Sequence, residues 1–217
     1  PLPVVVKADG LAAGKGVIIA QTEAEAQDAV RSLGPTLVIE EFLIGEEVSF
    51  IALADGKSVL PLEASQDHKT VFDDDQGPNT GGMGANTDGR ILTSAQTQQV
   101  LDTIIQPAVR AASFTGFLYA GLMMTADGPK TLEFNVRLGD PETQPLMHRM
   151  RGGFADALMR SATGTLAGAK LDWSPDPSLC VVLAAHGYPG QVRSGDRIDL
   201  PPRRDRRRVR RTHPRAA

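Results

Sequence analysis

The sequence predicts an α+β fold in which antiparallel strand pairs carry flanking helices. Strand-like runs of β-branched or alternating apolar residues are joined by short turns such as Asp55-Gly56, which is typical of hairpins. Between them, residues 22–33 and 94–112 have the apolar spacing of helices. A hydrophobic share of 41% and a charged share of 23% are ordinary for a globular protein of 217 residues.

The first elements are a hairpin and a helix. Residues 4–7 are expected to form a strand that enters the glycine-rich turn "ADGLAAGKGV", and residues 17–20 form the returning strand. "TEAEAQDAVRSL" predicts a helix, because Thr22 and Glu25 have the spacing of a capping box and apolar residues fall on one face. The helix is expected to stop at Gly34.

The middle of the chain predicts three strands and a long loop. "TLVIEEF" and "EEVSFIALADG" are strands joined by a tight link at Ile44 and Gly45, and residues 57–62 pair with the second of them. Residues 65–90 are almost all polar or glycine. We expect a loop without secondary structure here, and loops of this length are usually functional or disordered.

The second half predicts helices around another strand pair. Residues 94–112 are expected to be helical, with an interruption or kink at Pro107. "GFLYAGLMMTADG" and "TLEFNVRLG" form the strand pair. A short or bent helix is expected to begin at Asp140 and Pro141, and another covers residues 153–163.

"LCVVLAAHGYPG" predicts a buried strand that ends in a turn. Cys180 is the single cysteine of the chain, so a disulfide within the chain is excluded. We expect Cys180 to be a small buried hydrophobe. No run approaches about 18 apolar residues, and no membrane partner is expected. The cysteine usage favours a cytoplasmic protein.

The expected organisation has three parts: a main domain at 1–172, the beginning of a small C-terminal β-rich domain at 173–202, and a basic, disordered tail at 203–217. The tail holds eight Arg and one Asp, which leaves an acidic body unsuited to nucleic acid. The tail is either a polyanion-binding arm or an unstructured or foreign end. Because the chain opens on "PLPVVVKADG" without a Met, we also expect that an N-terminal part is missing.

A row of polar residues follows the last of the long strands. Side chains alternate between the faces of a strand, so Glu133, Asn135 and Arg137 are predicted to share one face. The intervening apolar residues are predicted to share a core face: Leu132, Phe134, Val136 and Leu138. The polar face offers two oxygen donors and a cation, or else it is the solvated face of an edge strand with a surface ion pair.

The glycine-rich stretch "DGLAAGKGV" suits phosphate binding, because backbone N–H groups in such a turn can surround phosphate oxygens and Lys15 adds charge. It is not a P-loop, since only three residues separate Gly10 from Gly14, and Gly16 stands where a Ser or Thr would bind magnesium. Lys7 ends the strand beside it, where its ammonium could reach a phosphate. The alternative is a plain flexible hairpin.

Two acidic groupings add to these features. "EEFLIGEE" places Glu40, Glu41 and Glu47 at a link between strands whose free backbone groups suit an adenine edge, while a carboxylate can accept both ribose hydroxyls. Alternatively, the glutamates keep a sheet edge soluble. The long loop adds "QDHK" and three aspartates at 73–75, which either bind metal or are solvated. No zinc site is expected, because His68 lacks a companion at zinc-site spacing.

Several segments together resemble the phosphoribosylamine–glycine ligases of the ATP-grasp superfamily, over about residues 3–200. The matching segments are "VVKADGLAAGKGV", "IEEFLIGEEVSF", "SQDHK", "GPNTGGMGA", "TGFLYAGLM" and "LEFNVRLGDPETQP". The resemblance implies a partial ATP-grasp fold and the ligation of glycine to 5-phosphoribosylamine in de novo purine biosynthesis. ATP would be cleaved to ADP and phosphate through a glycyl phosphate, with Mg²⁺ or Mn²⁺ as the metal. It further implies the small-molecule substrates glycine and 5-phosphoribosylamine. We expect a cytoplasmic monomer without a nucleic-acid partner.

The resemblance also implies roles for individual residues. Glu133 and Asn135 would be the metal ligands, and Lys7 would contact phosphate. The implied nucleotide contacts are Gly14, Lys15 and Gly16 over the phosphates, Glu40 with the backbone of Glu41 to Leu43 at adenine, and Glu47 at the ribose. The implied catalytic residues, which face phosphates or glycine, are Arg137, Asp140 and Lys69.

The chain departs from the family's pattern at several points. Family members begin with a glycine-rich Rossmann-like domain and another phosphate-binding lysine, which this sequence lacks. "GANTDGR" stands where "GAYSP" is usual, and the resemblance ends at about Pro201, before the basic tail. Two alternatives are therefore an inactive nucleotide-binding fragment of such a ligase and another ATP-grasp carboxylate-amine ligase.

Overall fold

The computed structural model describes residues 1–10, 16–74 and 76–199. Contacts divide the chain into one unit from Pro1 to Leu183 and a second from Ala184 onward. In its described part, the second unit forms turns without a helix or strand, closed by backbone hydrogen bonds such as that from Arg193 N to His186 O. No helix among the described residues is both long and apolar enough to cross a membrane. The domain limits expected from the sequence stay a prediction.

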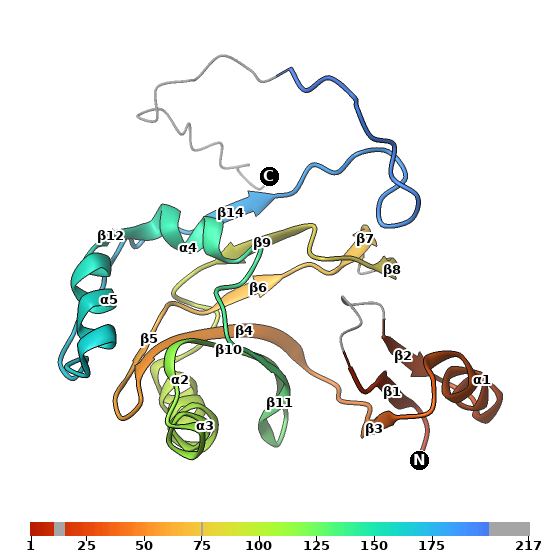
Figure 1. Ribbon diagram of the computed structural model, residues 1–217, viewed down its shortest axis with the longest axis horizontal. Helices are drawn as coiled ribbons and strands as arrows, with labels where there is room; N and C mark the ends of the chain where they lie inside the picture. The colour runs from red at the N-terminus through yellow and green to blue at the C-terminus, as the bar shows by residue number, and fades with distance from the viewer. Residues whose placement is uncertain (11–15, 75, 200–217) are drawn as a thin grey trace, which may run out of the picture. The chain divides into compact units, whose positions relative to one another are not determined.

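A three-stranded antiparallel sheet holds the first part of the chain. Its order is β2 (Val17–Ala20), β1 (Val4–Ala8) and β3 (Leu37–Glu41), and α1 (Glu23–Leu33) follows β2 (Figure 1). The predicted hairpin of β1 and β2 and the predicted helix are confirmed. Their packing buries one apolar set between α1 and the sheet: Val6, Ala20 and Ala29.

The start of α1 shows why this stretch is helical. Thr22 Oγ1 accepts a hydrogen bond from Glu25 N at 3.2 Å, which satisfies one of the free donors of the first turn. The Glu25 carboxylate accepts from Gln21 N at 2.8 Å, one residue before the N-cap. Gly34 ends the helix with a φ of 103°, a conformation that favours glycine.

The second sheet has seven strands and is antiparallel at every pairing. Its path is β11-β10-β4-β6-β9-β14, with β5 beside β4. Its strands are β4 (Glu46–Asp55), β5 (Val59–Pro61), β6 (Ser65–Asp67), β9 (Gly84–Thr87), β10 (Thr115–Thr125), β11 (Gly128–Asn135) and β14 (Ser178–Val181). The predicted pairing of β5 with β4 and of β10 with β11 is confirmed.

The expectation of a loop without secondary structure at 65–90 is wrong. Besides β6 and β9, the segment contains a small antiparallel pair, β7 (Thr70–Phe72) and β8 (Gln76–Asn79). A last small pair joins β12 (Met150–Gly152) to β13 (Asp172–Trp173). The strands at 65–90 were missed because they are short and polar, so no apolar pattern marks them. In addition, β6 and β9 pair with strands that are remote in sequence, whereas β7 and β8 pair with each other.

Four α-helices and a π-helical turn surround the larger sheet. They are α2 (Ser94–Val100), the π-helical turn η1 (Leu101–Ile105), α3 (Gln106–Ala112), α4 (Thr143–Arg149) and α5 (Phe154–Thr163). The predicted interruption at Pro107 is confirmed. The π-helical turn lies just before this proline, which lacks an N–H for the helical ladder.

Strand β4 shows how the larger sheet is covered. Val48, Phe50 and Ala52 belong to the core cluster beneath α2 and α3. Ile51 and Leu53 point to the other face, where they meet residues of α4 and α5. Helices therefore cover both faces of the central strands, as Figure 1 shows.

The predicted core face of the last long strand is wrong in part. Strand β11 ends at Asn135, so the strict alternation does not extend to Arg137. A register shift leaves Leu132 without a direct partner on β10. Phe134 is 46% exposed and Val136 is 72% exposed, so these two side chains do not lie in the core.

Two further expectations differ from the structure. Strand β14 is not buried: it lies at the end of the sheet path, Leu179 and Val181 are exposed, and Cys180 is half-buried. The helix expected at Asp140 begins instead at Thr143, because the preceding residues form a turn.

Candidate active site

One face of the larger sheet gathers polar side chains from four strands. The register places Glu133 of β11 opposite Gly121 of β10, and Gly121 opposite Ser49 of β4. Ser49 in turn faces Ser65 of β6. Side chains paired across antiparallel strands share a face. Glu133 and Ser49 therefore lie on the same side of the sheet, with only a glycine between them.

The two predicted metal ligands fit a hard divalent cation. Glu133 and Asn135 lie two residues apart on β11 and so point to the same face. A Cβ on Gly121 would lie 3.2 Å from Glu133 Cγ, so the glycine leaves room for the carboxylate against the sheet. The described residues contain no group of three or more His, Cys, Asp or Glu side chains placed for a metal. Two oxygen donors suit Mg²⁺, which usually keeps substrate phosphates and waters as its other ligands.

Lys7 connects the two sheets. Its ammonium lies 2.6 Å from Glu40 Oε2 of β3 and donates to the Leu132 carbonyl of β11 at 3.1 Å. The chain separation of 125 residues between Lys7 and Leu132 makes this a purely tertiary contact. The lysine therefore lies beside the residue that precedes Glu133, which brings a cation next to the predicted metal ligands.

The sheet face around Lys7 is apolar and partly exposed. The pairing places Val5, Ile19 and Val38 on the same face as Lys7, and Val38 pairs directly with Lys7. Ile19 is 49% exposed and Val38 is 45% exposed. Sequence reasoning did not single out these side chains. The alternation of the three strands, with a lysine and a glutamate on this face, was the available signal.

A second cation, Lys69, lies among carboxylates. Its Nζ pairs with Glu47 Oε2 at 3.0 Å. Burial alone would lower the pKa of the Lys69 ammonium, but the nearby charges of Asp67, Glu47 and Glu133 outweigh it and raise the pKa. Lys69 is therefore protonated at neutral pH, and its charge acts on Glu133. The structure brings three predicted site residues together here: Glu47, Lys69 and Glu133.

A buried group of hydroxyls and a carboxylate lies behind these charges. Ser49 Oγ donates to Glu142 Oε1 at 2.9 Å and lies 3.0 Å from Tyr119 Oη. All three residues are buried, with Glu142 only 2% exposed. Burial, followed by the charge of Glu142, raises the pKa of Tyr119, which keeps the phenol protonated. Glu142 was quoted within "RLGDPETQ", but its inward direction depends on the turn and could not be predicted.

The pKa of Asp67 is raised, which predicts a measurable pH dependence of stability. Burial raises the pKa of its carboxyl above 3.8, and the charge of Lys69 only partly opposes the shift. A carboxyl with a raised pKa in the folded state binds protons that the unfolded chain releases, so stability falls as pH rises from about 4 through the raised pKa. We expect Asp67→Asn to raise the urea midpoint at pH 7 and to gain less at pH 4. Equal gains at both pH values would contradict the assignment.

The remaining predicted residues are placed differently. Arg137 and Asp140 are exposed in the connection from β11 to α4, where Arg137 donates to Leu138 O at 2.9 Å and Asp140 accepts from Gln144 at 2.7 Å. Among the described residues, these side-chain contacts of Arg137 and Asp140 stay local, whereas Lys69 pairs with Glu47. Glu41 is exposed at the end of β3, and Leu43 is half-buried in the link to β4. Gly16 is buried, and its carbonyl accepts a hydrogen bond from Ala8 N. Gly14 and Lys15 lie outside the described residues.

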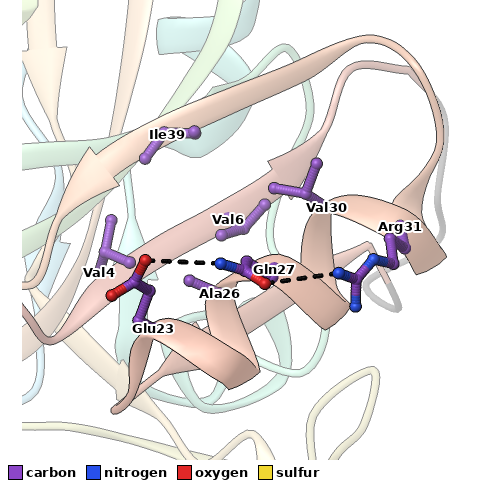
Figure 2. Close-up of a pocket in the computed structure, with 8 residues that line it drawn as sticks. All are labelled: Val4, Val6, Glu23, Ala26, Gln27, Val30, Arg31 and Ile39. Carbon is purple, nitrogen blue, oxygen red and sulfur yellow. Dashed lines mark hydrogen bonds between the residues drawn. The ribbon is translucent and has the colours of Figure 1, made fainter.

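A pocket between α1 and the smaller sheet is separate from these residues. Figure 2 shows Val4, Val6 and Ile39 from the sheet facing helix residues such as Ala26 and Val30. Hydrogen bonds at its rim join Gln27 to Glu23 and to Arg31, both at 3.4 Å. The pocket lies on the face of β1 opposite to Lys7, because Val4 and Val6 alternate with Val5 and Lys7.

Comparison with protein families and curated proteins identifies relatives of the chain. The family described as "Phosphoribosylglycinamide synthetase, ATP-grasp (A) domain" matches residues 1–143. The phosphoribosylamine–glycine ligase of Yersinia pestis is 52% identical over 211 residues, which cover 90% of this chain and 49% of the relative. That of Escherichia coli O6:H1 is 50% identical with the same coverage. The chain thus spans about half the length of the curated relatives it matches.

Comparison with solved structures agrees. The crystal structure of the phosphoribosylamine–glycine ligase of Thermotoga maritima matches with a TM-score of 0.78 and 35% identity, over 92% of this chain and 54% of that chain. The N5-carboxyaminoimidazole ribonucleotide synthetase of Thermus thermophilus, at 17% identity and a TM-score of 0.61, covers 85% of this chain and 47% of its own and shares the fold. The predicted α+β ATP-grasp fold is confirmed, in part of its extent, and so is the resemblance drawn from the motifs. The chain belongs to the phosphoribosylglycinamide synthetase ATP-grasp (A) domain family.

Proposed function

We propose that the chain takes part in the ATP-dependent ligation of glycine to 5-phosphoribosylamine, which gives glycinamide ribonucleotide, ADP and phosphate. The names of its relatives, at 50% identity or more, support this reaction. The observation that carries the proposal is that two lysines lie near Glu133 of β11. Lys7 bonds the carbonyl next to Glu133, and Lys69 acts on Glu133 through its charge. The two ammonium groups can neutralise charge on a triphosphate, and the Glu133 carboxylate can bind its metal.

The nucleotide is assigned to the space beside Lys7. The exposed apolar face of the smaller sheet offers a flat surface for a base, and the backbone from Glu41 to Leu43 offers hydrogen bonds to its edge. Glu40 would exchange its contact with Lys7 for the base, which frees the ammonium for phosphate. Glu47 is assigned to the ribose, and the glycine-rich turn with Gly14, Lys15 and Gly16 to the phosphates.

The metal is assigned to Glu133 and Asn135. Mg²⁺, or Mn²⁺ in its place, would supply positive charge against the phosphate oxygens and so stabilise the transferring phosphoryl group. Both protein ligands are hard oxygen donors of the kind these ions take. Lys69 adds a fixed charge on the same face, and Glu47 holds it in place.

The proposed reaction has two displacements. A glycine carboxylate oxygen attacks the γ-phosphorus, the bond to the β-phosphate oxygen breaks, and ADP leaves with that electron pair. The amine of 5-phosphoribosylamine then attacks the glycyl phosphate carbonyl, phosphate leaves, and the nitrogen loses a proton. Lys69, Arg137 and Asp140 are assigned to the binding of phosphates and glycine. The side chains act by charge and position rather than as nucleophiles.

A second candidate function is nucleotide binding without ligation. The groups assigned to the metal and most of those assigned to ATP lie in the described residues. Lys7 bonds Glu40 and the Leu132 carbonyl of the other sheet, and Lys69 pairs with Glu47. In contrast, Arg137 and Asp140 are exposed, and their hydrogen bonds are to Leu138 and Gln144 nearby in the chain. We further propose that the protein is a cytoplasmic monomer, that it has no nucleic-acid partner, and that its domain limits are those expected from the sequence.

Calorimetry of ATP binding to the 217-residue chain, with and without Mg²⁺, tests the proposal together with an ADP-release assay. ADP release that requires both glycine and 5-phosphoribosylamine would support ligation. Metal-dependent ATP binding without such release would favour the second candidate. Absence of ATP binding would contradict both.

A further inference from the structure

We propose that Glu142, Ser49 and Tyr119 act as positioning residues for the metal platform of Glu133 and Asn135. This buried triad would hold the two ligands in the geometry that the metal–nucleotide complex needs. The inference rests on the proposed function, because it assumes that the platform binds a metal with ATP.

The triad is closed by short contacts between elements far apart in the chain. Ser49 is its centre: its hydroxyl lies 2.9 Å from the Glu142 carboxylate and 3.0 Å from the Tyr119 hydroxyl. Ser49 has one proton, which it donates to Glu142, and its lone pair can accept the proton of the Tyr119 hydroxyl, so the three residues form one network. Asp67 Oδ1 lies 3.5 Å from Ser49 Oγ, so the carboxylate beside Lys69 is adjacent to this network.

The turn before α4 is built to bring Glu142 inward. A Cβ on Gly139 would collide with the Glu142 carboxylate, so the glycine leaves room for the carboxylate to fold back in its observed position. Glu142 is 2% exposed, and its backbone carbonyl accepts the hydrogen bond from Leu146 N at 3.2 Å. A buried carboxylate is costly unless its partners are fixed. Packing alone would not favour a buried carboxylate at this position, so we infer that Glu142 is kept for its contact with Ser49.

The sheet register connects the triad to the metal ligands. Tyr119 pairs directly with Asn135, and Ser49 pairs with Gly121, which pairs with Glu133. A Cβ on Gly121 would contact both Tyr119 at 3.7 Å and Glu133 at 3.2 Å, so the phenol ring and the carboxylate stem flank the same glycine. The hydrogen bond with Ser49 fixes the Tyr119 hydroxyl and therefore limits how the ring can move against β11, which carries Glu133 and Asn135.

A network behind metal ligands has a measurable signature. Partners that orient ligands typically change metal affinity about 10- to 100-fold when they are lost. They need not change the affinity of the nucleotide in the absence of metal. A purely structural role would lower stability and leave the metal dependence of binding as it was.

The experiment compares Ser49→Ala, Glu142→Gln and Tyr119→Phe with the wild-type 217-residue chain. Calorimetry measures ATP affinity with Mn²⁺, with Mg²⁺ and without metal, and electron paramagnetic resonance measures bound Mn²⁺ in the presence of ATP. Ser161→Ala is the matched control, because Ser161 is another buried serine whose hydroxyl donates to Ala54 O at 2.7 Å. Ser49→Thr tests rescue by a retained hydroxyl. Urea unfolding of each variant gives its stability.

We expect Ser49→Ala and Glu142→Gln to weaken Mn²⁺ binding about 10-fold or more, while metal-free ATP affinity stays within about twofold. Ser161→Ala should keep the metal affinity, and Ser49→Thr should recover most of it. Unchanged metal affinity in all three triad variants would overturn the inference, and so would an equal loss in Ser161→Ala. If Ser49→Ala or Glu142→Gln does not fold, Tyr119→Phe decides, since it removes a single hydroxyl. A wild-type chain without metal-dependent ATP binding would instead contradict the proposed function and remove the basis of this inference.

Discussion

Replacing Glu133 by alanine is expected to reduce glycine-dependent ADP release about 100-fold or more, comparable to the loss of one strong contact to the transition state. The reason is that Glu133 is the only carboxylate assigned to the metal, and Asn135 alone is a weak platform. ATP binding with Mg²⁺ should fall towards the value without Mg²⁺. Both quantities can be measured on the same preparation, by ADP release and by calorimetry.

Glu23→Ala is the matched control for this prediction. Glu23 is an exposed glutamate of α1 whose side chain bonds Gln27 on the far face of the smaller sheet. Its loss should leave turnover and the metal dependence unchanged. If Glu133→Ala keeps near-normal turnover at limiting Mg²⁺, the assignment of Glu133 to the metal is wrong.

Lys7→Met is expected to weaken ATP binding about 10- to 100-fold, because a hydrogen bond to a charged group contributes about 1.5–3 kcal/mol. The loss should be similar with and without Mg²⁺, since the ammonium is assigned to phosphate rather than to the metal. This distinguishes Lys7 from Glu133, whose loss should act only when metal is present. The change also removes the contact to Leu132 O and leaves Glu40 without its cation.

Lys57→Met serves as the control for the lysine, because Lys57 is exposed in the turn between β4 and β5. It should bind ATP like the wild type. A Lys7→Met chain that binds ATP as tightly as the Lys57→Met chain would show that Lys7 does not contact the nucleotide. A loss confined to conditions with Mg²⁺ would show that Lys7 acts through the metal instead.

The local elements were predictable because their causes lie within a few residues. Thr22 and Glu25 fixed the beginning of α1, and β-branched runs around a glycine-rich turn fixed the hairpin of β1 and β2. The motif segments around Glu133 and Lys69 were also sufficient to suggest the family, which the comparisons confirm.

The strand limits near the site were less predictable. Alternation was a sound guide to the shared face of Glu133 and Asn135, but it failed beyond Asn135, where the strand ends. It also failed for Phe134, since burial depends on what packs against a face and not on the alternation itself. The strands at 65–87 were missed because they are short and polar, and because β6 and β9 pair with strands remote in sequence.

The sequence by itself determined the secondary structure of the strong amphipathic segments and the family, and it suggested candidate site residues such as Glu133 and Lys69. The tertiary structure alone decided how these groups meet. It joined Lys7 to a carbonyl 125 residues away, paired Lys69 with Glu47 near the charge of Asp67, and closed the buried network around Ser49. Such contacts depend on sheet register and on the turn at Gly139, where a single added carbon would collide with Glu142. Neither is encoded in the spacing of residues along the chain.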